Sequence, residues 1–312
     1  MENIVTIDNL VKRYKEKIAV DNFSLHVKEG EILGLLGPNG SGKTTTINCL
    51  LSLLSYDKGE IKIFGKSMAS DAYDIKSMIG VVPQNIAVMD TLTVYENIDF
   101  FCGLYIKDKN LRKKYVSEAL EFTGLTEYKK YKPKKLSGGL LRRLNIALGI
   151  AHKPKLIIFD EPTVAVDPQS RNAILEGIKK MNRNGATIIY TSHYMEEVEE
   201  ICSRIVIMDH GKNVANGSSS ELKNLLKVSE SIIIGIPNKD DKIISGIKEI
   251  NHVHDVKFKD NELYINFEGG EHNLVHVLEF LNEHNIPFGH VTSKQPTLND
   301  VFLEITGKEL RD

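Results

Sequence analysis

The sequence contains the glycine-rich run Gly37-Pro38-Asn39-Gly40-Ser41-Gly42-Lys43-Thr44-Thr45. Residues 31–36 before this run are mostly apolar and strand-like, and residues 45–51 after it have the pattern of a helix. A phosphate-binding loop requires this context, because its glycines let backbone N–H groups point inward and the helix adds its positive end to the same cavity. The whole run is therefore predicted to hold the phosphates of a nucleoside triphosphate.

Two side chains of this run have specific predicted roles. Lys43 is expected to reach the β and γ phosphates as a point charge, which makes it a catalytic candidate as well as a binding one. The hydroxyl group of Thr44 is expected to ligate the Mg²⁺ that accompanies the nucleotide.

The length and composition are those of an ordinary globular protein. With 312 residues, the chain has room for one large domain and a smaller one. Its net charge of -2 gives no general attraction to nucleic acid, so no nucleic-acid partner is expected. No apolar stretch approaches the roughly 20 residues that cross a bilayer, and the start lacks the pattern of a secretion signal. We expect a cytoplasmic chain with three reduced, packed thiols at Cys49, Cys102 and Cys202.

The hydrophobic pattern predicts an α/β fold. The apolar runs 155–160 and 186–192 are too continuous for half-exposed strands and indicate central strands of a parallel sheet. Residues 205–209, followed by Gly211, are typical of a hairpin at the sheet edge. Helical spacing recurs in three segments, 94–104, 111–123 and 140–151, which predicts a helical subdomain over about 85–151.

A change of composition at Asn216-Gly217-Ser218-Ser219-Ser220 marks the end of the first domain. The predicted domains are therefore residues 1–219 and 220–312. The second domain has the pattern strand, helix, strand, strand, helix, strand over the segments 231–236, 239–250, 253–259, 262–267, 272–283 and 288–292. This order predicts a ferredoxin-like α+β sandwich, with Asp260-Asn261 as the turn of its central hairpin.

Two acidic residues follow a predicted central strand. Asp160 closes the strand, where a carboxylate is well placed to bind Mg²⁺ beside the phosphate loop. Glu161 comes next and is the candidate general base, because a side chain one position beyond the strand end faces the γ phosphate and an attacking water.

A second anion site is predicted at Leu136-Ser137-Gly138-Gly139-Leu140, which opens a helix. Ser137 is a good helix cap, and Gly138 and Gly139 bare the backbone N–H groups of the helix start. Taken together with the phosphate loop and the Asp160-Glu161 pair, this motif resembles the ATP-binding subunit of ABC transporters, and the resemblance spans about residues 2–219.

The resemblance implies a P-loop NTPase fold, ATP and Mg²⁺ as ligands, and four further site residues. Tyr14 matches the aromatic residue that stacks on adenine. Gln84 matches the glutamine that touches Mg²⁺ and the attacking water, and His193 matches the histidine that contacts the γ phosphate. Asp167 matches the aspartate that couples the two sites of a dimer, and it is also a candidate cap for the helix after Pro168.

The resemblance also implies partners. In this family, the Ser137 motif of one protomer completes the ATP site of another, so a second copy of the chain is expected. A membrane permease, which this sequence does not contain, would hold the chain at the inner face of the cell membrane. The end of the chain, residues 296–311, resembles the tail of daunorubicin-type multidrug and antibiotic-resistance exporters. The sequence does not indicate the cargo.

Two departures from the family pattern stand out. Leu140 replaces the usual Gln after the double glycine, which puts the contacts of a Gln side chain in doubt. Val164, Ala165 and Val166 replace the usual small or polar residues before Asp167.

Three alternatives remain open. One is an importer ATPase, because the permease encodes the direction of transport. A second is a soluble ABC-type ATPase that acts on ribosomes or DNA, although the sequence shows neither a second nucleotide unit nor a long coiled-coil insertion. The third is a regulatory role, in which the second domain senses a small ligand.

Overall fold

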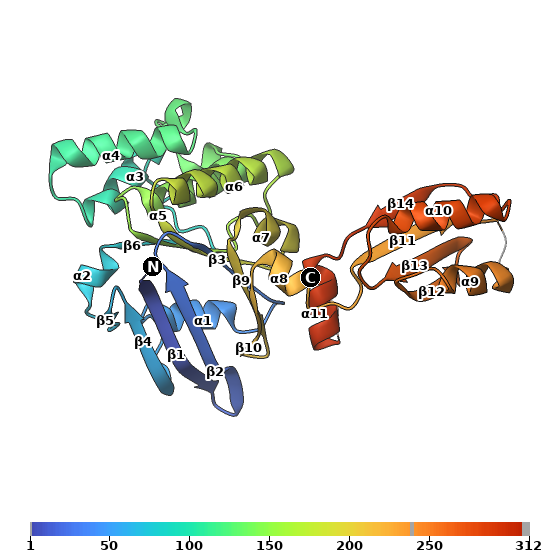
Figure 1. Ribbon diagram of the computed structural model, residues 1–312. Helices are drawn as coiled ribbons and strands as arrows, with labels where there is room; N and C mark the ends of the chain where they lie inside the picture. The colour runs from blue at the N-terminus through green and yellow to red at the C-terminus, as the bar shows by residue number, and fades with distance from the viewer. Residues whose placement is uncertain (1, 238–239, 308–312) are drawn as a thin grey trace. The chain divides into compact units, whose positions relative to one another are not determined.

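The structure is a computed structural model that describes residues 2–237 and 240–307. The chain divides into two compact units, residues 2–218 and residues 219–307 (Figure 1). Each unit has its own sheets, helices and hydrophobic core, and each is described by itself.

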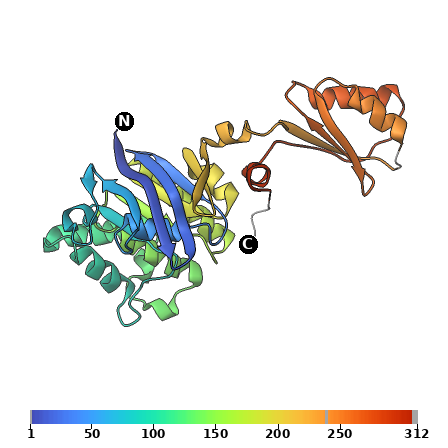
Figure 2. The same ribbon diagram turned by 90° about the horizontal axis from the view of Figure 1, so that it is seen from below.

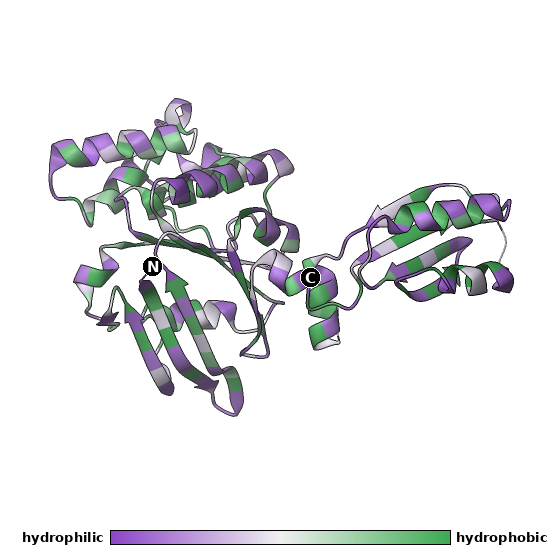
Figure 3. Cartoon of the chain, in the orientation of Figure 1, coloured by the Kyte–Doolittle hydropathy of each residue, from purple (hydrophilic) through white to green (hydrophobic). Residues whose placement is uncertain are grey.

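An antiparallel sheet begins the first unit, with the strand order β2-β1-β4-β5. The strands are β1 (Asn3–Tyr14), β2 (Lys17–Lys28), β4 (Lys58–Ile63) and β5 (Lys66–Ser67). Apolar and polar residues alternate along β1 and β2, which gives this sheet one buried and one exposed face (Figure 3). The sequence predicted only parts of β1 and β2 and did not predict β4 or β5.

A six-stranded sheet forms the centre of the first unit, in the order β10-β9-β3-β8-β7-β6. Its strands are β3 (Ile32–Leu36), β6 (Ile79–Val82), β7 (Leu156–Asp160), β8 (Thr187–Ser192), β9 (Arg204–Asp209) and β10 (Lys212–Gly217). All neighbours pair in parallel except β9 and β10, which form the predicted edge hairpin. Every residue of β3, β7 and β8 is buried, which explains their continuous apolar sequences and confirms the mostly parallel sheet.

Outside the helical subdomain, four helices lie between the strands of the first unit. They are α1 (Lys43–Leu50), α2 (Tyr73–Lys76), α6 (Pro168–Arg183) and α7 (Met195–Ile201). Helices α2 and α7 were not predicted from the sequence, because both are too short for a helical period to stand out. Helix α7 packs against β3 and β8, so it lies directly behind the centre of the sheet.

The predicted helical subdomain is also confirmed. It consists of α3 (Val94–Gly103), α4 (Lys109–Phe122) and α5 (Gly138–Ile150), with two short 3₁₀ turns at Thr126–Tyr128 and Pro133–Lys135. A capping box between Thr93 and Glu96 starts α3, and the side chain of Asp108 caps α4. The three helices enclose a small apolar core that includes Val94, Leu120 and Leu144. The three cysteines of the chain are free thiols, as predicted, and two of them are buried.

The second unit contains a four-stranded antiparallel sheet in the order β12-β13-β11-β14. Its elements are β11 (Glu230–Gly235), α9 (Asp241–Lys248), β12 (Val253–Lys259), β13 (Glu262–Phe267), α10 (Asn273–Glu283) and β14 (Val291–Lys294). Helices α9 and α10 cover one face of the sheet (Figure 2). This arrangement confirms the predicted ferredoxin-like order.

The central hairpin of this unit agrees with the prediction, and the last strand differs from it. Asp260 and Asn261 have φ angles of 52° and 61°, which matches the predicted tight turn of the central hairpin. The prediction for the last strand, residues 288–292, was wrong by about three residues, because β14 begins only at Val291. Gly289 and His290 exchange backbone hydrogen bonds with Gly235 without continuing the ladder. Residue 239, the predicted start of α9, lies outside the described residues.

Two further helices complete the second unit, α8 (Ser219–Lys223) and α11 (Leu298–Thr306). They pack against each other, and Leu222 of α8 is buried together with Val301 and Phe302 of α11. Leu303 and Ile305 on α11 remain more than one third exposed. Residues 308–311 of the predicted exporter-like tail lie outside the described residues.

Candidate functional site

Four predicted site segments follow neighbouring parallel strands. The phosphate loop begins at Gly37 directly after β3, Glu161 follows β7, and His193 follows β8. Gln84 lies two residues after β6. Since parallel strands place their carboxyl ends at the same edge of a sheet, the topology brings these four segments to one crevice.

The phosphate loop depends on glycine at two positions. A Cβ atom at Gly37 would lie 2.2 Å from the backbone oxygen of Met208, so no larger residue fits there. Gly42 has a φ of 112° and forms the N-terminal cap of α1, a conformation that favours glycine. The buried hydroxyl of Ser41 has no hydrogen-bond partner among the described residues. A bound phosphate oxygen would satisfy such a group, which fits the predicted role of the loop.

Lys43 is buried, and its ammonium group turns back into the loop. The Nζ atom donates hydrogen bonds to the backbone oxygens of Gly37 and Pro38, at 2.7 and 3.2 Å. It also lies 3.5 Å from Oε1 of Glu161. Burial lowers the pKa of Lys43, and the neighbouring carboxylates of Glu161 and Asp160 oppose this shift.

Asp160 and Thr44 form a cluster of oxygen atoms beside Lys43. The Thr44 hydroxyl donates to Oδ2 of Asp160 at 3.2 Å, and the Thr191 hydroxyl donates to Oδ1 at 2.6 Å. Hydroxyl and carboxylate oxygens are the ligands that Mg²⁺ prefers in proteins. The donor set therefore suits the predicted metal, with Thr191 fixing the carboxylate from its other side.

Three of the predicted residues converge on Glu161. Nε2 of Gln84 donates to Oε2 of Glu161 at 3.1 Å, and Nδ1 of His193 lies 3.3 Å from the same oxygen. Lys43 approaches the other carboxylate oxygen. Glu161 is 5% exposed and has a φ of 48°, a left-handed conformation that is unusual for a residue other than glycine.

A pocket of about 360 Å³ opens next to this cluster. Its lining consists of Tyr14, Lys17, Ala19, Asn39, Gly40, Gly42, Lys43, Thr44, Thr45, Gln84 and Glu161. Tyr14 is 48% exposed, as a side chain that stacks on a ligand would be, and the ammonium of Lys12 lies 5.3 Å from its ring centre. Lys17 and Ala19 were not predicted, because they belong to a separate strand, β2, and lie outside the motifs.

Ser137 and Asp167 do not line this pocket; they lie beside each other elsewhere in the first unit. Ser137 is exposed, and its hydroxyl accepts a hydrogen bond from the backbone of Leu140 at the start of α5. Asp167 caps α6 by accepting from the backbone N–H of Ser170 at 2.9 Å, and this bond lowers the pKa of Asp167. A Cβ atom at Gly139 would lie 3.1 Å from Oδ2 of Asp167, which shows how close the two motifs are.

The two departures from the family pattern have clear positions. Leu140 is half-buried and packs against the apolar core of the helical subdomain. The polar amide of a Gln side chain would not make this apolar contact. Val164 and Val166 are half-buried, and Ala165 between them has a φ of 59°.

Helix α5 holds the loop that carries Gln84. Nη1 of Arg142 donates to the backbone oxygen of Gln84 at 2.8 Å, and Nδ2 of Asn145 donates to that of Pro83 at 3.1 Å. Oδ1 of Asn145 accepts from the backbone N–H of Ala87 at 3.0 Å. Neither Arg142 nor Asn145 was predicted as a site residue, although two polar residues three positions apart on an apolar helix face are a signal of a buried polar contact.

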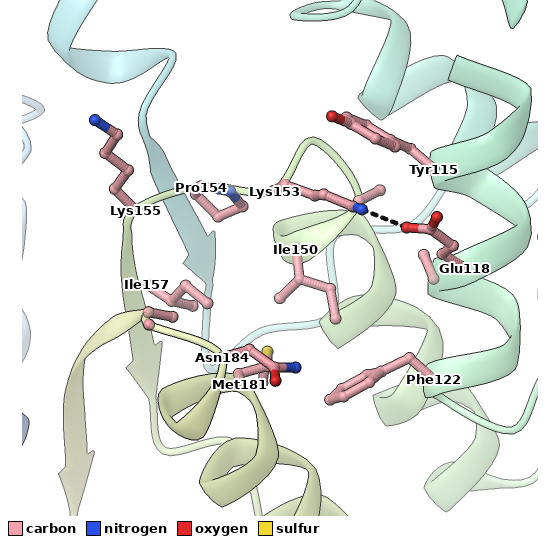
Figure 4. Close-up of a pocket in the computed structure, with 14 residues that line it drawn as sticks. Tyr115, Glu118, Phe122, Ile150, Lys153, Pro154, Lys155, Ile157, Met181 and Asn184 are labelled. Atoms are coloured by element: carbon pink, nitrogen blue, oxygen red, sulfur yellow. Dashed lines mark ion pairs between the residues drawn. The ribbon is translucent and has the colours of Figure 1, made fainter. Parts of the chain in front are cut away.

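A separate hollow of about 490 Å³ lies between α4 and the ends of α5 and α6 (Figure 4). Its walls include the apolar side chains of Phe122, Ile150 and Met181, and an ion pair joins Lys153 to Glu118 at its rim. Lys155 in its lining precedes β7, so the hollow lies at the opposite end of that strand from Asp160. It is therefore distinct from the nucleotide pocket.

No helix in the part of the chain that the structure describes is long and apolar enough to cross a membrane.

The chain matches two family models. The ABC transporter model matches residues 20–164, and the model for the C-terminal domain of DrrA1-3-like ATP-binding proteins matches residues 217–306. The linearmycin resistance ATP-binding protein LnrL of Bacillus subtilis is 42% identical over 308 residues, which cover 98% of this chain and 99% of the relative. The daunorubicin resistance ATP-binding protein DrrA2 of Streptomyces coeruleorubidus is 31% identical over 307 residues, which cover 97% and 95%.

The first unit also resembles solved structures. An ATP-binding cassette, MJ0796, in a dimeric post-hydrolysis state bound to ADP and Pi, superposes with a TM-score of 0.63 and 28% identity. The match covers 69% of this chain and 98% of the other. These similarities confirm the family resemblance that the motifs and the tail predicted. The chain belongs to the ATP-binding, ATP-hydrolysing subunits of ABC transporters, in the branch of the drug- and antibiotic-resistance exporters.

Proposed function

We propose that this ATPase drives the export of a drug, an antibiotic, a lipid or another small molecule through a separate membrane permease. The proposal is supported by the relatives, which are linearmycin and daunorubicin resistance ATP-binding proteins and match 98% and 97% of the chain. On this proposal the chain is cytoplasmic and lies on the inner face of the membrane through its permease.

The convergence of Lys43, Gln84 and His193 on Glu161 is the observation that supports the catalytic proposal. Glu161 accepts a proton from the attacking water, and Gln84 and His193 orient that water and the γ phosphate. Lys43 leaves its carbonyl partners and pairs with the β and γ phosphates. Mg²⁺, held by Thr44, Asp160 and Gln84, would supply positive charge opposite the phosphate oxygens.

The remaining predicted binding residues have separate roles. Tyr14 stacks on the adenine ring. The backbone of residues 37–42, together with Thr45 at the start of α1, wraps the phosphates. We place the nucleotide-binding function in residues 1–219, with its helical subdomain at about 85–151, and an accessory function in residues 220–312.

Two copies of the chain form the working site. Ser137 and Gly138 are exposed at a capped helix start, and Gly139 next to them is buried. None of these residues lines the pocket of its own chain, and neither does Asp167. They are therefore free to meet the γ phosphate held by a second copy, which ATP binding would close and hydrolysis would release.

The substitution Glu161→Gln tests this proposal. It keeps the size of the side chain and removes the base, so ATP hydrolysis should slow by at least ~100-fold, because a general base contributes about 10² to 10⁴ in rate. ATP binding should persist, and the trapped nucleotide should hold a dimer that is visible by size-exclusion chromatography with light scattering.

Glu121→Gln is the matched control, because Glu121 is exposed on α4 and remote from the pocket. Normal hydrolysis by Glu161→Gln would remove Glu161 from the catalytic role. A slow variant that binds ATP and remains monomeric at every protein concentration would contradict the shared site.

A further inference from the structure

Glu197 on α7 carries a fully buried carboxylate that lies outside the nucleotide pocket. Its Oε2 atom accepts hydrogen bonds from the hydroxyls of Tyr190 at 2.6 Å, Thr163 at 2.8 Å and Ser192 at 3.2 Å. Its Oε1 atom lies 2.8 Å from Nε of Arg171 on α6. One side chain therefore contacts four residues from three different segments.

These partners are close in sequence to the residues with proposed roles at the ATP site. Thr163 lies two residues after Glu161, and Ser192 directly precedes His193. Arg171 lies in the first turns of α6, and its backbone N–H bonds to the carbonyl of Asp167 at 2.9 Å. The buried carboxylate thus links the loop of Glu161, the loop of His193 and the helix that Asp167 caps.

The chemistry of this cluster favours a role beyond packing. A carboxylate pays a large desolvation cost on burial unless it is paired and hydrogen-bonded, and an apolar side chain would fill the same space without that cost. Burial and the nearby Glu197 carboxylate raise the pKa of Tyr190 well above its ordinary value, so Tyr190 stays a neutral hydrogen-bond donor. The hydrogen bonds of this network fix the orientations of the side chains, which apolar contacts do not.

The loops that the network holds contain residues in unusual backbone conformations. Glu161 and Ala165, on either side of Thr163, both have positive φ angles, of 48° and 59°. Such conformations persist only where the surrounding structure holds them. The hydrogen bond from Thr163 to Glu197 anchors the segment between these two residues.

We propose that Glu197 is a positioning residue of the ATPase. It holds Glu161, His193 and the Asp167 cap of α6 in fixed positions relative to one another. The inference rests on the roles proposed above for those three residues. It assigns Arg171 as the partner that transmits the position of α6 to the same carboxylate.

The main test compares Glu197→Gln with Glu196→Gln, an exposed neighbour on the same helix. Glu197→Gln should lower kcat by about 10- to 100-fold, the loss expected when catalytic groups are misplaced by about 1 Å. The dissociation constant for ATP should stay within about twofold, because the phosphate loop and Tyr14 are not part of the network. Glu196→Gln should match the parent in both measurements.

A second readout does not depend on turnover. In a Glu161→Gln background, ATP should hold the dimer. Adding Glu197→Gln should weaken that dimer, because Asp167 is no longer held in position.

If Glu197→Gln does not fold, Arg171→Met replaces it, since one third of the Arg171 side chain is exposed. If both variants fold, their combined loss of kcat should be close to that of either one alone, because residues that act as a unit are not additive.

Normal kcat and a normal ATP-trapped dimer in Glu197→Gln or Arg171→Met would overturn the inference. The inference would also be overturned if the ATP affinity and the midpoint of unfolding fell in proportion to kcat, because a purely structural role predicts that result. Normal turnover by Glu161→Gln would instead remove the proposed catalytic role itself. Slow Glu161→Gln beside normal Glu197→Gln would overturn only the positioning role.

Discussion

The ammonium group of Lys43 has three oxygen neighbours in the structure: the carbonyls of Gly37 and Pro38 and the carboxylate of Glu161. A buried cation needs such partners, and the phosphates of ATP would replace them with stronger, charge-assisted hydrogen bonds. Lys43 is therefore held beside the place where the phosphates are proposed to bind, without a need to refold the loop.

Replacement of Lys43 by Ala should weaken ATP binding by about 10- to 100-fold, because a hydrogen bond to a charged group is worth about 1.5–3 kcal/mol. Titration with a fluorescent ATP analogue measures this loss. Lys58→Ala, at an exposed position of β4, is the control. An unchanged affinity in Lys43→Ala would contradict the assignment of the phosphate loop.

The residues at the pocket could be predicted from sequence because parallel strands bring them together. Glu161 and His193 follow buried apolar strands, and such strands deliver their next residues to one edge whatever the loops between them do. Arg142, Asn145 and Glu197 could not be predicted in this way. Polar residues on helices usually face solvent, and only the packing of α5 and α7 buries these three.

At the scale of elements, α5 joins two sites that the sequence presents separately. Its N-terminus is the Ser137 motif, and Arg142 and Asn145, about one and two turns later, hold the backbone that carries Gln84. A displacement of the helical subdomain would therefore move the Gln84 loop with the Ser137 motif. This provides a physical route by which a permease in contact with the subdomain would reach the catalytic centre.

Asn145→Ala should release the Gln84 loop, since it removes the donor to Pro83 and the acceptor for Ala87. We expect kcat to fall by about tenfold with ATP affinity unchanged, because misplaced catalytic groups cost rate and not binding. Stability should fall by about 1–3 kcal/mol, the cost of leaving buried polar groups unpaired. Steady-state kinetics and urea unfolding give both values.

Asn110→Ala, at an exposed position on α4, is the control for that substitution. An Asn145→Ala variant with lower stability and normal kcat would show that Asn145 supports the fold only.

The elements that the sequence missed or misplaced have physical causes. Strand β5 has two residues and α2 has four, so neither repeats a period long enough to detect. Strand β14 begins late because Gly289 precedes it, and glycine weakens strand pairing. Long alternating or fully buried segments such as β3, β8 and β13 were predicted to within about two residues, the usual uncertainty of element boundaries.

At the scale of the whole molecule, the chain carries each half of the proposed ATP site once. The pocket around Lys43 and the Ser137 motif both belong to the first unit, and the second unit contributes no residue to the described lining of that pocket. In α11, Phe302 is buried where the helix packs with α8, while Leu303 and Ile305 remain accessible.

Truncation after Ser218 tests whether the second unit serves coupling and not nucleotide chemistry. Residues 219–307 enclose their own core, around Ile232, Leu263 and Val277, so their removal should leave a foldable ATPase. The affinity for ATP should stay within about twofold of the parent, since no nucleotide contact is lost. The permease-dependent part of the ATPase rate, measured in membranes that contain the complex, should fall.

Leu303→Ser in the full chain is the complementary variant, because it keeps the fold of the second unit and changes only an exposed apolar side chain. If the accessible part of α11 docks on the permease or on a second copy, this variant should reproduce the coupling defect of the truncation. A normal Leu303→Ser beside a defective truncated chain would place the coupling surface elsewhere in residues 219–307. Loss of folding or of ATP binding on truncation would show that the second unit stabilises the first, because the core of the first unit would then not be independent of the second.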